Sequence, residues 1–214
     1  MEHTHPFVIA ISRQLGCGAA HIGRLVAQRL QFHYIDREVI REAARNLGLQ
    51  EAEVRDREER LTSVWESILK VFAVGSPEAG APAAPYPVVQ DQELFAVEAQ
   101  IVRKLAREQS CVIVGKAAAH VLGETPGLLR VFLHAPMPCR ARRLMEVDRI
   151  TDQAEACARI EVSDESRERF LRAMVGADWT DARCYDLCLN TGRVDFVQAQ
   201  EMIVTLVENA RRTG

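Results

Sequence analysis

Residues 7–20 read Phe-Val-Ile-Ala-Ile-Ser-Arg-Gln-Leu-Gly-Cys-Gly-Ala-Ala, an apolar run that leads into a short segment with two glycines. The apolar part, from Phe7 to Ser12, has the composition of a strand that is buried on both faces of a parallel sheet. After Gly18, apolar residues follow helical spacing as far as Leu30. A strand, a glycine loop and a helix in this order predict the start of an α/β protein.

The same alternation continues along the chain. Four more apolar stretches predict strands, at 32–35, 111–114, 128–135 and 186–190. Helical spacing of apolar residues predicts helices at 39–47, 51–74, 94–105 and 196–212. Residues 75–87 are rich in Gly, Pro and Ala and predict a linker, so 51–90 form an insertion. The sequence therefore predicts a three-layer α/β sandwich around a parallel sheet.

Composition limits the class of protein. The 214 residues suffice for one domain, 1–214, with room for an insertion. The 27 Lys and Arg against 30 Asp and Glu give a net charge of −3, which disfavours a nucleic-acid partner. No apolar stretch approaches the roughly 18 residues of a membrane helix, and the start lacks signal-peptide features, so we expect a cytoplasmic protein without a membrane partner. The six cysteines form no Cys-x-x-Cys pair and are interpreted as small buried residues rather than as disulfides or metal ligands.

The glycine loop is the first candidate binding site. In parallel α/β sheets, ligands bind beyond the carboxyl ends of the strands. The segment from Ser12 to Ala20 has the glycines and the helix start of a phosphate-binding loop, where backbone N–H groups and the helix dipole favour an anion. A tight connection that binds nothing would also explain the glycines, so the loop alone leaves both interpretations open.

Five sequence blocks occur in a fixed order over nearly the full length of the chain. They are Ile11–Gly18, Tyr34–Glu38, Val112–Lys116, Val131–Pro136 with Arg140, and Tyr185–Thr191. Together they resemble the cytidylate kinase-like family, a divergent branch of the P-loop nucleoside monophosphate kinases. The resemblance implies an α/β/α P-loop kinase fold with a five-stranded parallel sheet, an acceptor-binding segment and a lid at about 137–180. It also implies ATP and Mg²⁺ as cofactors and transfer of the γ-phosphoryl group to a nucleoside monophosphate, with CMP or dCMP as the expected acceptor.

The chain departs from the usual phosphate-binding loop at two positions. Matched to a Walker A loop, Gly16-Cys17-Gly18 forms its second half, Ala19 takes the place of the lysine that holds the β- and γ-phosphates, and Ala20 that of the hydroxyl that ligates magnesium. Members of this branch often lack that lysine. The third strand ends at Gly115 without a Walker B carboxylate, so the protein ligands of Mg²⁺ stay open and no metal-binding residue is assigned.

The resemblance assigns three groups of site residues. Cofactor binding falls to Ser12, Arg13, Gly16, Cys17, Gly18, Ala19, Ala20, Asn190 and Thr191. Substrate binding falls to Asp36, Arg37, Gly115, Lys116 and Arg143. Catalytic charge is expected from Arg13, Lys116, Arg140 and Arg167, because phosphoryl transfer asks mainly for positioning and positive charge.

Structural alternatives accompany these assignments. Arg13 also fits a surface charge, Asp36 a helix N-cap, and residues 190–192 a simple turn. The arginines between 140 and 172, Arg140 and Arg167 included, form the predicted lid group, and they also fit solvated helix charges that pair with nearby acids, Asp164 among them.

Two other functions compete with the kinase. Ala19 and Ala20 are also compatible with a nucleotide-binding regulator that has lost phosphoryl transfer. Gly16-x-Gly18 with Asp36 about 20 residues further on resembles a dinucleotide-binding fingerprint. In that fingerprint the third glycine would fall at His21, which makes this interpretation the weakest of the three.

Overall fold

The computed structural model describes residues 6–36, 91–115 and 118–213, and within them five parallel strands form one sheet. The strands are β1 (Val8–Arg13), β2 (His33–Asp36), β3 (Cys111–Val114), β4 (Leu128–His134) and β5 (Leu187–Asn190). Their order across the sheet is β2-β3-β1-β4-β5, and every neighbouring pair is parallel. The predicted five-stranded parallel sheet is thereby confirmed. Because β3 separates β1 from β2, the order also differs from that of a dinucleotide-binding sheet, in which strands 1 and 2 are neighbours.

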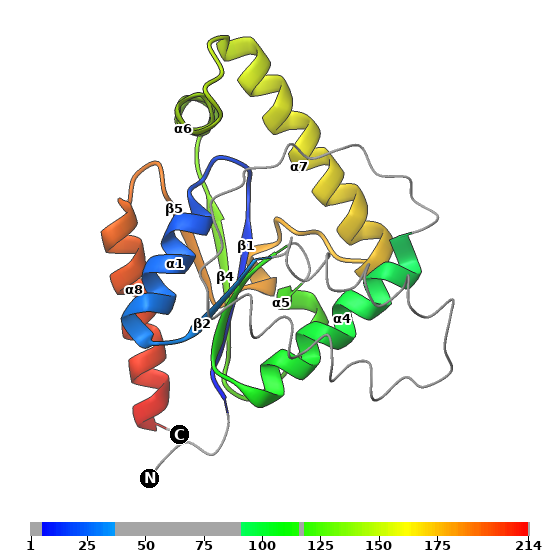
Figure 1. Cartoon of the computed structure of the whole chain (residues 1–214), viewed down its shortest axis with the longest axis vertical. Helices are drawn as coiled ribbons and strands as arrows, with labels where there is room; N and C mark the ends of the chain where they lie inside the picture. Colours follow the sequence, from blue (N-terminus) through cyan, green and yellow to red (C-terminus); the bar gives the residue numbers. More distant parts are fainter. Residues whose placement is uncertain (1–5, 37–90, 116–117, 214) are drawn as a thin grey trace.

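Helices cover both faces of the sheet. They are α1 (Ala19–Leu30), α4 (Asp91–Glu108), α5 (Ala118–Val121), α6 (Met137–Asp148), α7 (Gln153–Val175) and α8 (Phe196–Thr213), with a short 3-10 turn η1 (Ala182–Cys184). Figure 1 shows α1 and α8 on one face, α4 and α5 on the other, α6 beyond one end of the strands, and α7 running from there to the end of α4. The three predicted layers are present. Among the described residues no helix is long and apolar enough to cross a membrane.

The strands of the sheet centre are apolar on both faces because each face packs against helices. In β1, Val8 and Ala10 belong to the core that contains Leu105 of α4, whereas Ile9 and Ile11 belong to the core that contains Ile22 of α1. All four β1 residues have no exposed surface. This two-sided burial explains why the strand reads as an uninterrupted apolar run.

The expected lid region, 137–180, folds largely as two helices. Helix α6 ends at Asp148 and is capped by Arg149, which has a left-handed φ of 55°. Helix α7 begins after Asp152, whose side chain accepts the N–H of Ala154. The far end of α7 packs on α4, where the rings of Phe95 and Phe170 meet edge to face. These two helices therefore span from the end of β4 to the α4 side of the sheet.

Several predictions concern residues outside the described part of the chain. These are the helices at 39–47 and 51–74, the linker at 75–87, and the site residues Arg37 and Lys116.

Candidate functional site

The glycine loop between β1 and α1 has the backbone of an anion-binding nest. Gly16 and Gly18 both have left-handed backbones, with φ of 81° and 84°, and Cys17 lies between them without a positive φ. Such alternation turns successive N–H groups toward one concave surface. Neither glycine has room for a side chain, since a Cβ on Gly16 would lie 2.7 Å from the carbonyl oxygen of Arg140, and one on Gly18 would lie 2.6 Å from Cε1 of Phe196.

Two arginines of α6 hold the loop by its carbonyl groups. Arg140 Nη1 lies 3.4 Å from the carbonyl oxygen of Leu15, and Arg143 Nη1 lies 3.4 Å from that of Cys17. In a trans peptide the C=O and the next N–H point in opposite directions, and the described residues contain no cis bond. The N–H groups of Gly16 and Gly18 therefore point away from the two arginines. Helix α1 begins just beyond them without a side-chain cap, which leaves its first N–H groups for a ligand.

Arg140 and Arg167 meet at one carboxylate. Arg140 Nη1 donates to Asp164 Oδ2 at 2.5 Å, and Arg167 Nη1 donates to Asp164 Oδ1 at 3.2 Å and to Ser163 Oγ at 2.8 Å. Both arginines are buried, with 6% and 7% of their surface exposed. The alternative interpretation as charges paired with Asp164 is therefore right about the partner. It is wrong about the solvent, because both arginines are buried.

The pKa of the Cys17 thiol depends on burial and on the positive charge around the loop. Burial raises the pKa of Cys17, and the nearby guanidinium groups of Arg13, Arg167 and Arg143 oppose that rise. These arginines come from β1, α7 and α6, so three separate elements bring positive charge to one loop. At the position of the missing lysine, Ala19 is buried, with 2% of its surface exposed. The arginines therefore supply the local positive charge that the loop itself lacks.

Thr191 and Arg143 join the end of β5 to the loop. The Thr191 hydroxyl donates to the carbonyl oxygen of Cys17 at 2.7 Å, and Arg143 donates to Thr191 Oγ1 at 3.0 Å and to its carbonyl oxygen at 2.6 Å. The Arg143 guanidinium also lies 4.7 Å from the ring centre of Phe196. Asn190 accepts the N–H of Gly192 at 3.0 Å, as expected for a turn. Thr191, predicted to bind the cofactor, thus fixes the backbone of the loop.

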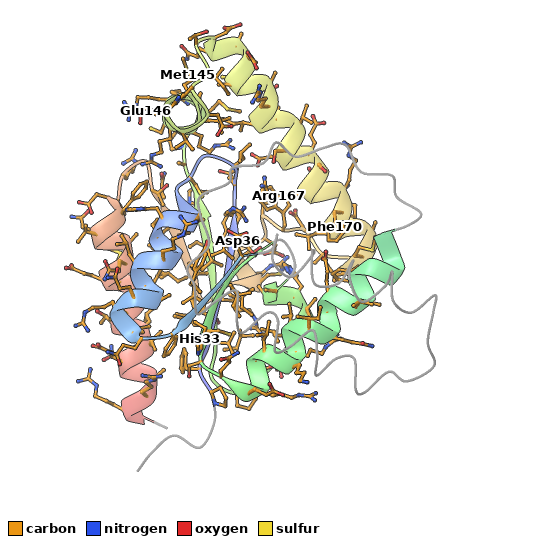
Figure 2. The ribbon with its side chains drawn as sticks, viewed as in Figure 1. His33, Asp36, Met145, Glu146, Arg167 and Phe170 are labelled. Carbon is orange, nitrogen blue, oxygen red and sulfur yellow. The ribbon has the colours of Figure 1, made fainter. Side chains whose placement is uncertain are left out.

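The predicted acceptor side lies at the ends of β2 and β3. Tyr34 donates its phenol proton to Asp36 Oδ2 at 3.0 Å, and burial and this carboxylate raise the pKa of Tyr34. Gly115 donates its N–H to the carbonyl oxygen of Ile11 at 3.1 Å, which places it beside β1. Figure 2 shows Asp36 at the end of β2 that is nearer to α7, and His33 at the opposite end. Asp36 therefore lies at the carboxyl edge of the sheet, as the sequence predicts.

Ser12 lies on the opposite face of β1 from Arg13. It shares the face of Val8 and Ala10, and its buried hydroxyl lies beside the Tyr185 phenol without the geometry of a hydrogen bond. The Tyr185 hydroxyl donates instead to the carbonyl oxygen of Trp179 at 2.7 Å. The Ser12 side chain is therefore packed in the α5 layer, separate from the arginines at the loop.

A magnesium site is not formed by the described residues alone. They contain no group of three or more His, Cys, Asp or Glu side chains that could hold a metal ion. Ala20 has no hydroxyl, and among the described strands only β2 ends in a carboxylate, that of Asp36. Asp164 is already bound by two arginines. These donors do not fit a protein-held Mg²⁺, and no catalytic step is assigned to the ion.

A parallel sheet of this strand order with a two-glycine loop between β1 and α1 defines a P-loop kinase fold. The sequence pattern of the cytidylate kinase-like family matches residues 8–193, and the chain belongs to this family.

Two curated relatives carry the name cytidylate kinase. The one from Methanopyrus kandleri is 33% identical over 99 residues, which cover 42% of this chain and 51% of the relative, so the match spans about half of that enzyme. The one from Sulfolobus acidocaldarius is 24% identical over 184 residues, which cover 86% and 84%.

Solved structures agree on the fold. An uncharacterized protein from Eubacterium ventriosum superposes with a TM-score of 0.69 at 22% identity, covering 94% of this chain and 98% of that one. Shikimate kinase from Bacteroides thetaiotaomicron superposes with a TM-score of 0.51 at 14% identity, covering 94% and 98%.

The structure adds two residues that the sequence did not single out as functional. The sequence pattern places Asp164 among the solvated acids of its helix, although its spacing of three residues from Arg167 puts the two on one helix face. Phe196 was assigned only to the closing helix, yet its ring covers Gly18 and stacks with Arg143. The three-residue spacing from Arg167 is a sequence signal for Asp164, whereas no local pattern indicates that Phe196 reaches the loop.

Proposed function

We propose that this protein is an ATP-dependent nucleoside monophosphate kinase with CMP or dCMP as its acceptor. The observation that carries the proposal is the glycine loop whose carbonyl groups are held by Arg140 and Arg143, so that its N–H groups remain for an anion. Membership of the cytidylate kinase-like family and the names of its two curated relatives support the choice of acceptor.

The arginines take the part that a lysine plays in most P-loops. The β-phosphate binds the N–H groups of Gly16 and Gly18 and the start of α1. Arg13 and Lys116 stabilise the charge of the transferred phosphoryl group, which needs positioning and positive charge rather than covalent chemistry. Arg140 and Arg167 add positive charge from the carbonyl side of the loop, where Asp164 holds them. Mg²⁺ would arrive bound to ATP rather than to the described residues, and it would supply neutralisation of phosphate charge.

The acceptor binds at the carboxyl ends of β2 and β3. Asp36, oriented by the phenol of Tyr34, contacts the acceptor nucleotide together with Arg37, Gly115 and Lys116. Residues 51–90 contribute to this side of the site, and α6 and α7, within 137–180, form the lid of a single domain. Hydrogen exchange with and without CMP tests the assignment: added protection in 51–90 supports it, and unchanged protection contradicts it.

A chromatographic assay tests the activity. The protein is incubated with ATP, Mg²⁺ and a mixture of CMP, dCMP, UMP, AMP and GMP, and every diphosphate that forms is quantified. The proposal predicts ADP with CDP or dCDP as the dominant products. If another nucleoside monophosphate in the mixture is converted to its diphosphate, the kinase activity stands and the proposed acceptor is wrong. If no nucleoside monophosphate is converted, the proposed activity is contradicted.

A nucleotide-binding regulator of the same fold is the second candidate. It is favoured by Ala19, which is buried where the phosphate-binding lysine would stand. A regulator predicts that ATP raises the melting temperature without any turnover. Arg13→Ala provides the contrast, because loss of turnover at an unchanged melting temperature would favour the kinase.

A further inference from the structure

Leu15 is held at both ends of its backbone by one ion pair. Its N–H donates to Asp164 Oδ1 at 3.2 Å, and its carbonyl oxygen lies 3.4 Å from Arg140 Nη1. Arg140 and Asp164 are themselves joined at 2.5 Å. The loop residue and the two side chains thus close a ring of hydrogen bonds between the loop, α6 and α7.

A further hydrogen bond to Asp164 connects this ring to Arg167. Asp164 Oδ1 accepts from both Leu15 and Arg167, while Oδ2 accepts from Arg140. Only 17% of the Asp164 side chain is exposed, and the two arginine side chains are exposed by 7% and 8%. Hydrogen bonds of charged groups at such a site are strong, because water does not compete for them.

Several guanidinium groups gather at the loop in the described part of the protein. One carboxylate faces two guanidinium groups, and Arg13 and Arg143 add further positive charge beside Cys17. Arg140 Nε is also buried without a hydrogen-bond partner in the described part of the protein. Among the described residues, the loop thus has more guanidinium groups beside it than carboxylates, which favours an anionic ligand.

We propose that Asp164 is the positioning residue of the donor-phosphate loop. It holds the Leu15 N–H directly and the Leu15 carbonyl group through Arg140. The direction of that carbonyl group determines where the N–H of Gly16 points, because the two belong to one planar peptide. Asp164 also orients Arg167. Through Asp164, the place of α7 and the shape of the loop depend on each other. This inference rests on the proposed function, since it assigns the donor phosphates to this loop.

Removing the charge without changing the size of the side chain tests the inference. In Asp164→Asn, one oxygen can still accept from Leu15, but an NH₂ group then faces the guanidinium of Arg140. The control is Glu168→Gln on the same helix, which removes the carboxylate of an exposed pair with Arg172 at 2.7 Å. ATP affinity is measured by calorimetry, the KM values for ATP and CMP by steady-state kinetics, and the Leu15 amide by native-state hydrogen exchange.

Asp164→Asn is expected to weaken ATP binding and raise the KM for ATP by on the order of tenfold. The KM for CMP is expected to stay within about twofold, because the groups that Asp164 holds lie at the donor loop and not at the carboxyl ends of β2 and β3. The Leu15 amide is expected to exchange about tenfold faster than in the wild type. Glu168→Gln is expected to change none of these quantities. A merely structural role would lower stability without separating the two KM values.

Equal ATP affinity in Asp164→Asn and Glu168→Gln would overturn the inference while leaving the kinase intact. Failure of the wild-type protein to bind ATP would instead overturn the proposed function. Should Asp164→Asn not fold, Asp164→Glu keeps the charge but moves the carboxylate outward by one methylene. It is expected to retain the fold and lose ATP affinity, and wild-type affinity in this variant would also overturn the inference.

Discussion

Gly18→Ala tests whether the loop needs its left-handed, side-chain-free backbone. Gly18 has φ of 84°, and a Cβ there would lie 2.6 Å from Cε1 of Phe196, whereas carbon atoms pack at about 3.5–4.0 Å. The left-handed strain costs about 1–2 kcal/mol, partly offset by about 0.4–1 kcal/mol because alanine restricts the unfolded chain. Moving the ring by about 1 Å adds about 1–3 kcal/mol of overpacking.

Gly176→Ala is the matched control. Gly176 caps α7 with φ of 66°, and nothing lies within 4 Å of its Cβ position, so this variant carries the backbone strain alone. Urea unfolding should therefore show Gly18→Ala to be less stable than Gly176→Ala by about 1–3 kcal/mol. Calorimetry should show weaker ATP binding for Gly18→Ala only, because displacement of Phe196 also disturbs Arg143. Equal stabilities with wild-type ATP affinity in both variants would refute the packing described at the loop.

Three further predictions concern the surroundings of the loop. Arg143→Lys should raise the KM for ATP by about tenfold in steady-state kinetics, because an ammonium cannot make the forked contact with Thr191 or stack in the same way. Thr191→Val should lower the free energy of unfolding in urea by about 1–2 kcal/mol, since the carbonyl oxygen of Cys17 loses its 2.7 Å donor; an unchanged midpoint would contradict this. Burial and Arg130 lower the pKa of His120 from 6.5, so the unfolded chain binds the extra proton and stability should fall as pH drops below about 6.5. Thermal unfolding between pH 5 and 7 checks this. Between pH 7 and pH 5, His120→Phe should lose less stability than the wild type does.

The sequence predicted the strands well because their burial is two-sided. The stretch 111–114 gave β3 with the observed bounds, and 128–135 gave β4 to within one residue. The order of the strands was not predictable from periodicity, because the pairing of β1 with both β3 and β4 joins segments about a hundred residues apart. The break between α6 and α7 is equally hard to predict, since it depends on a left-handed Arg149 rather than on a glycine or proline.

The site was predicted in its residue types but not in its connections. Arg140 and Arg167 were assigned to the lid, and the structure brings them together at Asp164. That junction depends on α7 folding back over the loop, which no local spacing encodes. Thr191 illustrates the same limit, because its hydroxyl bonds to Cys17, 174 positions away in the chain. Sequence patterns thus identify the groups that carry charge, whereas long-range packing decides which partner each group holds.

A crystal structure of the protein with bound ADP tests the central claim most directly. The account predicts that the β-phosphate lies within hydrogen-bond distance of the N–H groups of Gly16 and Gly18, with Arg140 and Arg143 still on the carbonyl groups of Leu15 and Cys17. A β-phosphate bound away from this loop, or a loop whose N–H groups point toward the arginines, would contradict it.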